Sequence, residues 1–151
     1  MVEATVPLGT ESNPAVDILV MFSKSSDPKV RSSVAKNPNT PSQALALLAL
    51  DSEAEVRISV ASNPSAPFEI LLALSKDKDD YVRCSVARNP SVPTEISEVL
   101  SKDDNWEVRM SVASNPATQD EILERLVDDE DNAVSLAASH NMNATRHLLR
   151  Q

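Results

Sequence analysis

Arginine and asparagine occupy regular places in this chain, and both side chains can bind anions or backbone groups. Each of four arginines follows a valine and stands 26 residues after the one before: Arg31, Arg57, Arg83 and Arg109. Six residues after each arginine comes an asparagine, in the series Asn37, Asn63, Asn89 and Asn115. A guanidinium group pairs with phosphate or carboxylate through parallel N–H donors, and an amide both donates and accepts. The pattern therefore predicts either a polar track that binds a ligand or a ladder that holds repeated units together.

We favour the ladder for both series, because a residue needed for packing between units must recur in every interior unit. The planar fork of arginine satisfies several acceptors at once. Its expected partners are Asp51, Asp77 and Asp103, which precede the repeated valines, and carbonyl groups of the turns. The asparagines share a helical face with the valines, so their amides are expected to satisfy backbone groups of the turns.

The nine residues VRSSVAKNP, from Val30 to Pro38, return three times with small changes and once in the degenerate form VSLAASHNM from Val134. The two valines of a copy lie four residues apart and the asparagine three beyond, so all three share one face of a helix. An asparagine before proline is pushed out of the α region, which ends that helix. Self-similarity at a fixed step of this length is typical of a stack of repeated units.

A second apolar pattern follows, with residues at i, i+1 and i+4, and it also predicts a helix. Its copies are Ile18/Leu19/Phe22, Ala44/Leu45/Leu48, Ile70/Leu71/Leu74, Ile96/Ser97/Leu100 and Ile122/Leu123/Leu126. Pro41, Pro67 and Pro93 stand where a first helical residue belongs, with Thr40 as an N-cap, and Thr118 to Glu121 resembles a capping box. Each unit is therefore expected to be two short helices that are stable only when stacked on a neighbouring unit.

The two ends of the chain depart from the repeat. We expect residues 1–12 to form an irregular N-terminal segment or cap, and residues 13–151 to form one repeat domain of about five units, the last degenerate. In that last unit Asn141 to Asn143 is expected to interrupt the helix. His140 and His147, which are seven residues apart, would then not share one helical face as metal ligands.

Composition excludes several classes of function. The formal net charge of −9 disfavours binding to nucleic acid or to anionic lipid. The single glycine, Gly9, rules out a glycine-rich phosphate loop. One cysteine, Cys84, leaves no intrachain disulfide, which suits a reducing compartment. No stretch approaches the roughly 18 unbroken apolar residues of a membrane span. We expect a cytoplasmic protein without a membrane segment.

The recurring pattern VRxSVAxNPxxPxxIL resembles the leucine-rich repeat variant family, and the resemblance extends from about Asn13 to Leu149. It implies an all-α, right-handed α-solenoid superhelix of two-helix units, with one helix per unit in the 3₁₀ form. The chain is also similar to HEAT repeats, which place an aspartate five residues before the valine–arginine pair. The resemblance implies no shared catalytic residues, and the lone Cys84 cannot supply the cysteine cluster that iron–sulfur members carry.

Residues that differ between units are the better candidates for function. Exposed aromatic and charged side chains in these places can anchor a partner, and the candidates are Tyr81, Trp106, Phe68, Arg88 and Glu107. We expect a non-enzymatic module that binds a protein or peptide. The partner would be basic, because the stretch from Asp103 to Asp131 is acidic. Self-association through the repeat ends is a further expectation.

Nucleic-acid binding, calcium binding and a reactive cysteine are less favoured by the same sequence. A nucleic-acid-binding or DNA-base-processing HEAT-like solenoid would need a net-basic face, which this composition opposes. Asp128 to Asp131 lacks the glycine and the terminal glutamate of a calcium loop, so an acidic solvated turn is expected. Cys84 stands where other units have serine, isoleucine or methionine, which indicates a packing position. We therefore expect no catalytic, cofactor or metal site.

Overall fold

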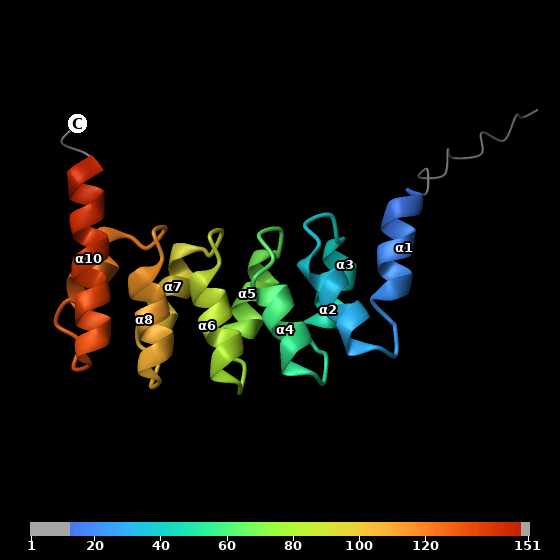
Figure 1. Ribbon diagram of the computed structural model, residues 1–151, viewed down its shortest axis with the longest axis horizontal. Coiled ribbons are helices and arrows are strands. Elements are labelled where there is room, and N and C mark those ends of the chain that lie inside the picture. Colours follow the sequence, from blue (N-terminus) through green and yellow to red (C-terminus); the bar gives the residue numbers. More distant parts are fainter. Residues whose placement is uncertain (1–12, 149–151) are drawn as a thin grey trace, which may run out of the picture.

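The structure, a computed structural model, describes residues 13–148, so the expected irregular segment 1–12 lies outside the described residues. The described part consists of helices and turns, with no strand among its residues (Figure 1). The helices are α1 (Pro14–Phe22), α2 (Pro28–Lys36), α3 (Ser42–Leu48), α4 (Ala54–Ala61), α5 (Phe68–Leu74), α6 (Asp80–Arg88), α7 (Thr94–Leu100), α8 (Trp106–Ser114), α9 (Asp120–Leu126) and α10 (Asn132–Leu148).

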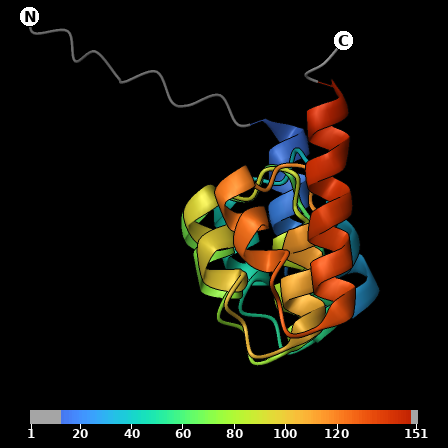
Figure 2. The same ribbon diagram turned by 90° about the vertical axis from the view of Figure 1, so that its left-hand side faces the viewer.

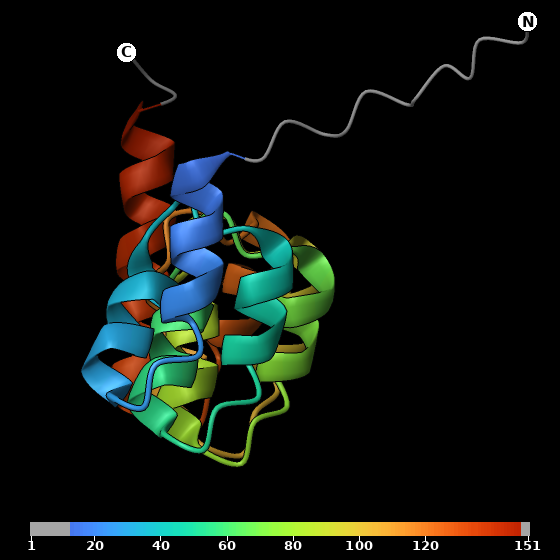
Figure 3. The same cartoon turned by 90° about the vertical axis from the view of Figure 1, so that its right-hand side faces the viewer.

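The helices form two layers of a solenoid. The even-numbered helices α2 to α10 pack directly on one another in chain order along the long axis (Figure 1). Each of α3, α5, α7 and α9 packs on the even-numbered helices before and after it. Figures 2 and 3 look along the stack from its two ends, with α10 nearest in one view and α1 in the other. This arrangement confirms the predicted repeat solenoid.

Both predicted apolar faces form the core. Val56, Val82 and Val108 of the even-numbered helices are fully buried, as are Leu45 and Leu71 of the odd-numbered ones. Because each helix is too short to be stable alone, this burial against neighbouring units holds it in place.

The first unit is less covered than the interior units. In α1 the side chains of Ile18 and Phe22 are 50% and 45% exposed, although their counterparts in later units are buried. The reason is that α1 packs mainly on α2 within the described part of the chain.

Both helices of each unit are α-helices, so the 3₁₀ helix that the family resemblance implied is not found between residues 13 and 148. Even the seven-residue helices end with a hydrogen bond of the α-helical type, which joins residues four apart. The amide of Ser75 donates to the carbonyl of Leu71 at 2.8 Å.

The predicted helix starts are shifted by one residue. Pro41, Pro67 and Pro93 are extended and precede the first helical residue, instead of being that residue. Thr40 is not an N-cap: its hydroxyl donates to the carbonyl of Val34 at 2.6 Å, at the end of the preceding helix. These prolines therefore mark the end of the turn and not the beginning of the helix.

The capping box predicted for the fifth unit is also wrong. Gln119 takes the N-cap position of α9, and its side chain makes no capping bond. The hydroxyl of Thr118 instead donates to the carbonyl of Val112 at 2.7 Å. A threonine at this place thus caps the C-terminal end of the even-numbered helix. The last carbonyl groups of a helix have no N–H donor within the helix, so a side-chain hydroxyl can donate to them.

Helix α10 continues where the other even-numbered helices end, so the expected interruption at Asn141 to Asn143 is wrong. Met142 occupies the place of the proline in the interior units and is buried. Methionine has a backbone N–H and no ring to clash with the preceding turn, so the helix extends to Leu148. His140 is exposed, and the side chain of His147 lies outside the described part.

The contacts between even-numbered helices alternate along the stack. Ser32 is buried between α2 and α4, where its hydroxyl lies 2.8 Å from that of Ser59. Cys84 takes the same place between α6 and α8 and is also buried. In the intervening units the larger Ile58 and Met110 stand in this place and are half-buried. In these four units, a small buried residue in one unit is thus followed by a larger, half-buried residue in the next.

Candidate functional site

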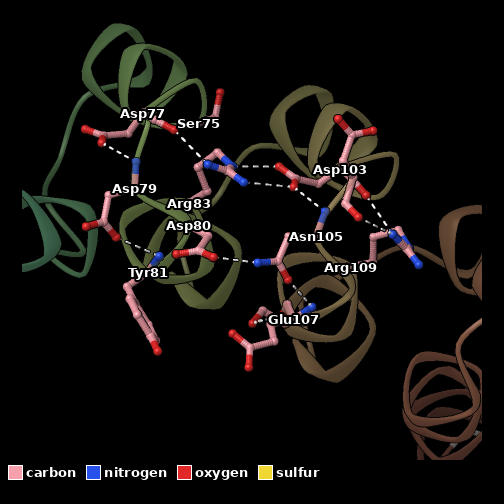
Figure 4. A network of polar contacts seen from close by, with 12 residues as sticks. Ser75, Asp77, Asp79, Asp80, Tyr81, Arg83, Asp103, Asn105, Glu107 and Arg109 are labelled. Atoms are coloured by element: carbon pink, nitrogen blue, oxygen red, sulfur yellow. Dashed lines mark hydrogen bonds and ion pairs between the residues drawn. The ribbon is translucent and has the colours of Figure 1, made fainter.

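Each repeated arginine joins its own turn to the next unit. Arg57 donates from Nε and Nη2 to the two carboxylate oxygens of Asp77, at 2.7 and 3.1 Å. Its Nη1 donates to the backbone carbonyl of Asp51 at 2.8 Å. Figure 4 shows the corresponding contacts of Arg83 with Asp103 and with the carbonyl of Asp77. The guanidinium group thereby fixes two consecutive turns relative to each other.

The four pairs have the same geometry and form a continuous chain of contacts. The pairs are Arg31–Asp51, Arg57–Asp77, Arg83–Asp103 and Arg109–Asp129. Each aspartate also accepts the backbone N–H two residues further on, as Asp77 does from Asp79 at 2.9 Å. The carboxylate thus shapes the turn whose carbonyl binds the next arginine. We refer to this set of pairs as the arginine ladder.

The pairing changes the titration of both partners. The hydrogen bond from Arg31 is the main cause that lowers the pKa of Asp51, and Arg109 acts in the same way on Asp129. For Asp103, burial has the largest single effect and acts to raise its pKa. The hydrogen bonds from Arg83 and from the N–H of Asn105 outweigh burial, so the pKa of Asp103 is lowered. The ladder is therefore ionised throughout the neutral pH range.

The repeated asparagines form a second ladder at the opposite end of the even-numbered helices. The side-chain amide of Asn89 donates to the carbonyls of Ala61 and Asn63 in the preceding unit, at 2.7 and 3.0 Å. Its oxygen accepts the backbone N–H of Ser91 at 2.8 Å. The side-chain amides of Asn63 and Asn115 make the same contacts, and that of Asn141 also donates to two carbonyls of the preceding unit. Asn37 accepts the N–H of Asn39.

These amides bind carbonyl groups that a short helix leaves free. An α-helix has no internal partner for its last four carbonyls, and α4 ends at Ala61. Asn89 is only 1% exposed, so the carbonyls that it contacts have little access to water. The side-chain nitrogen of the asparagine thus joins two units, while its oxygen holds the turn of its own unit.

The thiol of Cys84 is free and buried. Burial raises the pKa of the Cys84 thiol as the largest effect, which keeps the sulfur protonated. No group of three His, Cys, Asp or Glu side chains within residues 13–142 is placed to hold a metal ion. No described helix has the length and apolar character needed to cross a membrane.

The five candidate partner-binding residues do not form one patch. Tyr81 and Arg88 lie on the same exposed stripe of α6, seven residues apart, and Glu107 occupies the place of Tyr81 in α8. Tyr81 points away from the arginine ladder and is 63% exposed (Figure 4). Trp106 begins α8 and is 41% exposed. Phe68 begins α5 in the other layer, which separates it from the rest.

The structure also exposes apolar residues that the sequence patterns did not single out. Leu47 in α3 and Val99 in α7 are 54% and 48% exposed, and Leu50 after α3 is 84% exposed. The signal was the segment SQALALL, residues 42–48, which has more apolar residues than one buried face needs. These residues are therefore candidates for contact with a partner.

Removing one arginine should destabilise the stack. We expect Arg83→Ala to lower the free energy of unfolding by about 2–3 kcal/mol, because Asp103 and the carbonyl of Asp77 lose their donors in a half-buried site. Arg88→Ala, which removes an exposed arginine from the same helix, should change it by less than about 0.5 kcal/mol. Urea unfolding followed by circular dichroism measures both, and equal effects would contradict a structural role for Arg83.

The ladder should also make stability depend on pH. The pKa of Asp103 is lower in the folded protein than in the unfolded chain, so its ion pair contributes stability above about pH 4 and loses it as the pH falls through the folded-state pKa. We expect the stability difference between the wild type and Asp103→Asn to be constant from about pH 5 to 8 and to shrink below about pH 4. Urea titrations at each pH measure it, and a difference that persists in strongly acidic solution would argue against this linkage.

The asparagine ladder can be tested in the same unit. We expect Asn89→Ala to cost about 2–3 kcal/mol, because two buried carbonyls and the N–H of Ser91 lose their partner. Ser91→Ala is the matched control, since it keeps that N–H and removes only an exposed hydroxyl. Thermal and urea unfolding of both variants decide the point; an Asn89→Ala variant as stable as the control would show that water replaces the amide.

One solved structure with a similar fold is described as a leucine-rich repeat variant with a novel repetitive protein structural motif. The match covers 83% of this chain and 71% of that chain, with 24% sequence identity and a TM-score of 0.41. No curated protein matches the chain.

A comparison with protein families matches two stretches to the family described as leucine rich repeat variant, residues 28–53 and 106–131. Each stretch has the length of one repeat and begins at the first residue of an even-numbered helix, α2 or α8. Each matched stretch contains one of the repeated arginines and one of the repeated asparagines, Arg31 and Asn37 in the first and Arg109 and Asn115 in the second. Two repeats of this chain, those that begin with α2 and α8, thus match the repeat of the leucine-rich repeat variant family.

Proposed function

We propose that the protein is a non-enzymatic module that binds a protein or peptide through side chains displayed on a rigid stack. The observation that carries this proposal is that repeated residues and variable residues have different roles in the structure. The polar side chains that repeat, such as Arg83 and Asn89, are engaged in joining units. The side chains that differ between units, such as Tyr81 and Arg88, are exposed. Specificity would then depend on the variable positions.

A basic partner is favoured by the charge of the chain and its distribution. The turn before α10 carries four consecutive acids, residues 128–131. Arg109 pairs with Asp129 at 2.8 Å and lies 3.6 Å from the carboxylate of Glu130, which is still 90% exposed. Exposed carboxylates such as those of Asp104 and Asp128 extend this surface. Complementary charge raises the rate of encounter and selects against acidic partners.

The alternative of a nucleic-acid-binding or DNA-base-processing solenoid has less support. Binding to phosphates needs accessible cations, and the four repeated arginines are each paired with an aspartate. Titration with labelled duplex DNA at several salt concentrations tests this alternative. Saturable, salt-sensitive binding below micromolar concentrations would favour it over a protein partner.

Self-association through the repeat ends is a separate proposal, and α10 argues against it at one end. A following unit would need the free carbonyls that interior helices offer to the asparagine ladder. In α10 the helix continues past Asn141, so later amides take up those carbonyls. Sedimentation velocity over a range of protein concentrations measures the oligomeric state directly.

The proposed function is tested by recovery of partners from the native cells. We expect the wild-type protein to retain a specific set of proteins that the double variant Tyr81→Ala/Trp106→Ala recovers at several-fold lower yield, because exposed aromatic anchors dominate such contacts. Leu136→Ala, which removes an exposed apolar residue of α10, is the matched control. Absence of any protein retained by the wild type above bare resin would contradict the proposal.

A further inference from the structure

An exposed apolar strip crosses the layer of odd-numbered helices. Leu47, Ala73 and Val99 occupy the same place in α3, α5 and α7, and all three are exposed. Leu72 lies beside Ala73 and is half-buried, and Leu50 extends the strip beyond the end of α3. We call these five residues the apolar strip.

The fold does not need the apolar strip. The core-facing side of α3 is already supplied by Leu45 and Leu48, which are fully buried. Leu71 and Leu74 do the same for α5. A run of exposed apolar residues on consecutive units, beyond those that the core uses, marks an interaction surface more often than chance exposure does.

Charged side chains flank the strip on both sides. Glu69 and Glu95 stand in the first turns of α5 and α7, and both are exposed. Lys76 and Lys102 follow the last turns of the same two helices and are also exposed. Acids near a helix start and lysines near its end also suit the helix dipole. The result is an apolar strip with an acidic edge at Glu69 and Glu95 and an opposite edge of mixed charge, where Lys102 pairs with Glu98 and Asp104 is also exposed.

The strip ends at α9, and its edge of mixed charge is hollowed. At α9 the place of Val99 is taken by Arg125, which forms an ion pair with Glu98, so the surface becomes polar. Between α3 and α5 a cavity of about 470 Å³ is lined in part by Leu50 and Lys78. Between α5 and α7 a second cavity, of about 430 Å³, is lined in part by Val99 and Lys102.

We propose that the apolar strip binds an amphipathic α-helix of a partner protein, which lies across α3, α5 and α7. This inference rests on the proposed binding function and names the class of partner. The even-numbered helices pack on one another once per unit, and packed helices lie roughly 8–10 Å apart. Equivalent places on α3, α5 and α7 also recur once per unit, so the strip offers an apolar contact about every 10 Å. A helix presents the same face every seven residues, which is about 10.5 Å. An extended strand repeats its face about every 6.7 Å and would lose register.

Charge fixes the orientation of the bound helix about its own axis. The flank of the partner helix that faces Glu69 and Glu95 would carry lysine or arginine, while the opposite edge, where Lys102 pairs with Glu98, selects no single sign of charge. Cavities beside Leu50 and Val99 would accept side chains from the second flank. A helix of about 20 residues spans the three units with one turn beyond each end.

The test uses a synthetic fluorescein-labelled helix of about 20 residues with leucine at heptad spacing, lysines on one flank and glutamates on the other. Fluorescence anisotropy should show saturable binding to the wild-type protein at micromolar concentrations. A peptide with the leucines scrambled should not bind. A peptide with its two charged flanks exchanged should bind several-fold more weakly at low salt, and this difference should fade at high salt because salt screens exposed charges.

Variants locate the binding site. The double variant Leu47→Lys/Val99→Lys should bind the designed peptide about tenfold more weakly. Leu136→Lys places the same substitution at another exposed leucine, on α10, and should bind like the wild type. Circular dichroism should show all three proteins folded, since each substituted side chain is about half exposed. Failure of the wild type to bind, or equal binding by the double variant, would overturn the proposal.

The same variants separate this inference from the proposed function. Cellular partners that Leu47→Lys/Val99→Lys fails to recover, while Leu136→Lys recovers them, support the apolar strip. Partners that are lost only with Tyr81→Ala/Trp106→Ala leave the binding function in place and overturn the strip as its site. If no partner is recovered by any form, the proposed function fails, and the peptide titration still decides whether the strip binds a helix.

Discussion

The free carbonyl groups at the ends of short helices are the constraint on which this structure depends. Helices of seven to nine residues leave a large share of their backbone groups without internal partners. Stacking buries these groups, so each must be bound by something other than water. The amide of one asparagine binds two carbonyls of the preceding unit, as Asn115 does with Ala87 and Asn89. The same residue therefore recurs wherever two units meet.

At the N-terminal end of the even-numbered helices, the arginine ladder binds carbonyl groups of the turns and adds charge. Each guanidinium group takes a turn carbonyl of its own unit and the carboxylate of the next, as Arg109 does with Asp103 and Asp129. The valines between the two ladders, such as Val108, are fully buried. Polar contacts at both edges and an apolar seam between them define how successive units are placed. Few of the repeated polar groups therefore remain free to bind a ligand.

Function therefore falls to the residues that the stack leaves unused. The structure divides these into two separate surfaces, one with Tyr81 and Arg88 on α6 and one with Leu47 and Val99 on the odd-numbered helices. The first was identifiable in the sequence, because its residues change between units while their neighbours do not. The second was not, because a leucine in a short apolar helix looks the same whether it faces the core or solvent.

The sequence by itself determined the repeat, its two helices and the two polar series, because a step of 26 residues places equivalent side chains in equivalent environments. Only the tertiary structure decided which turn each arginine reaches, that Thr40 closes the preceding helix, and that both helices of a unit are α-helical. It also decided that α10 runs on past Asn141. The arginine contacts join residues 20 positions apart and the Thr40 contact crosses a turn, so the preferences of single residues cannot fix either of them.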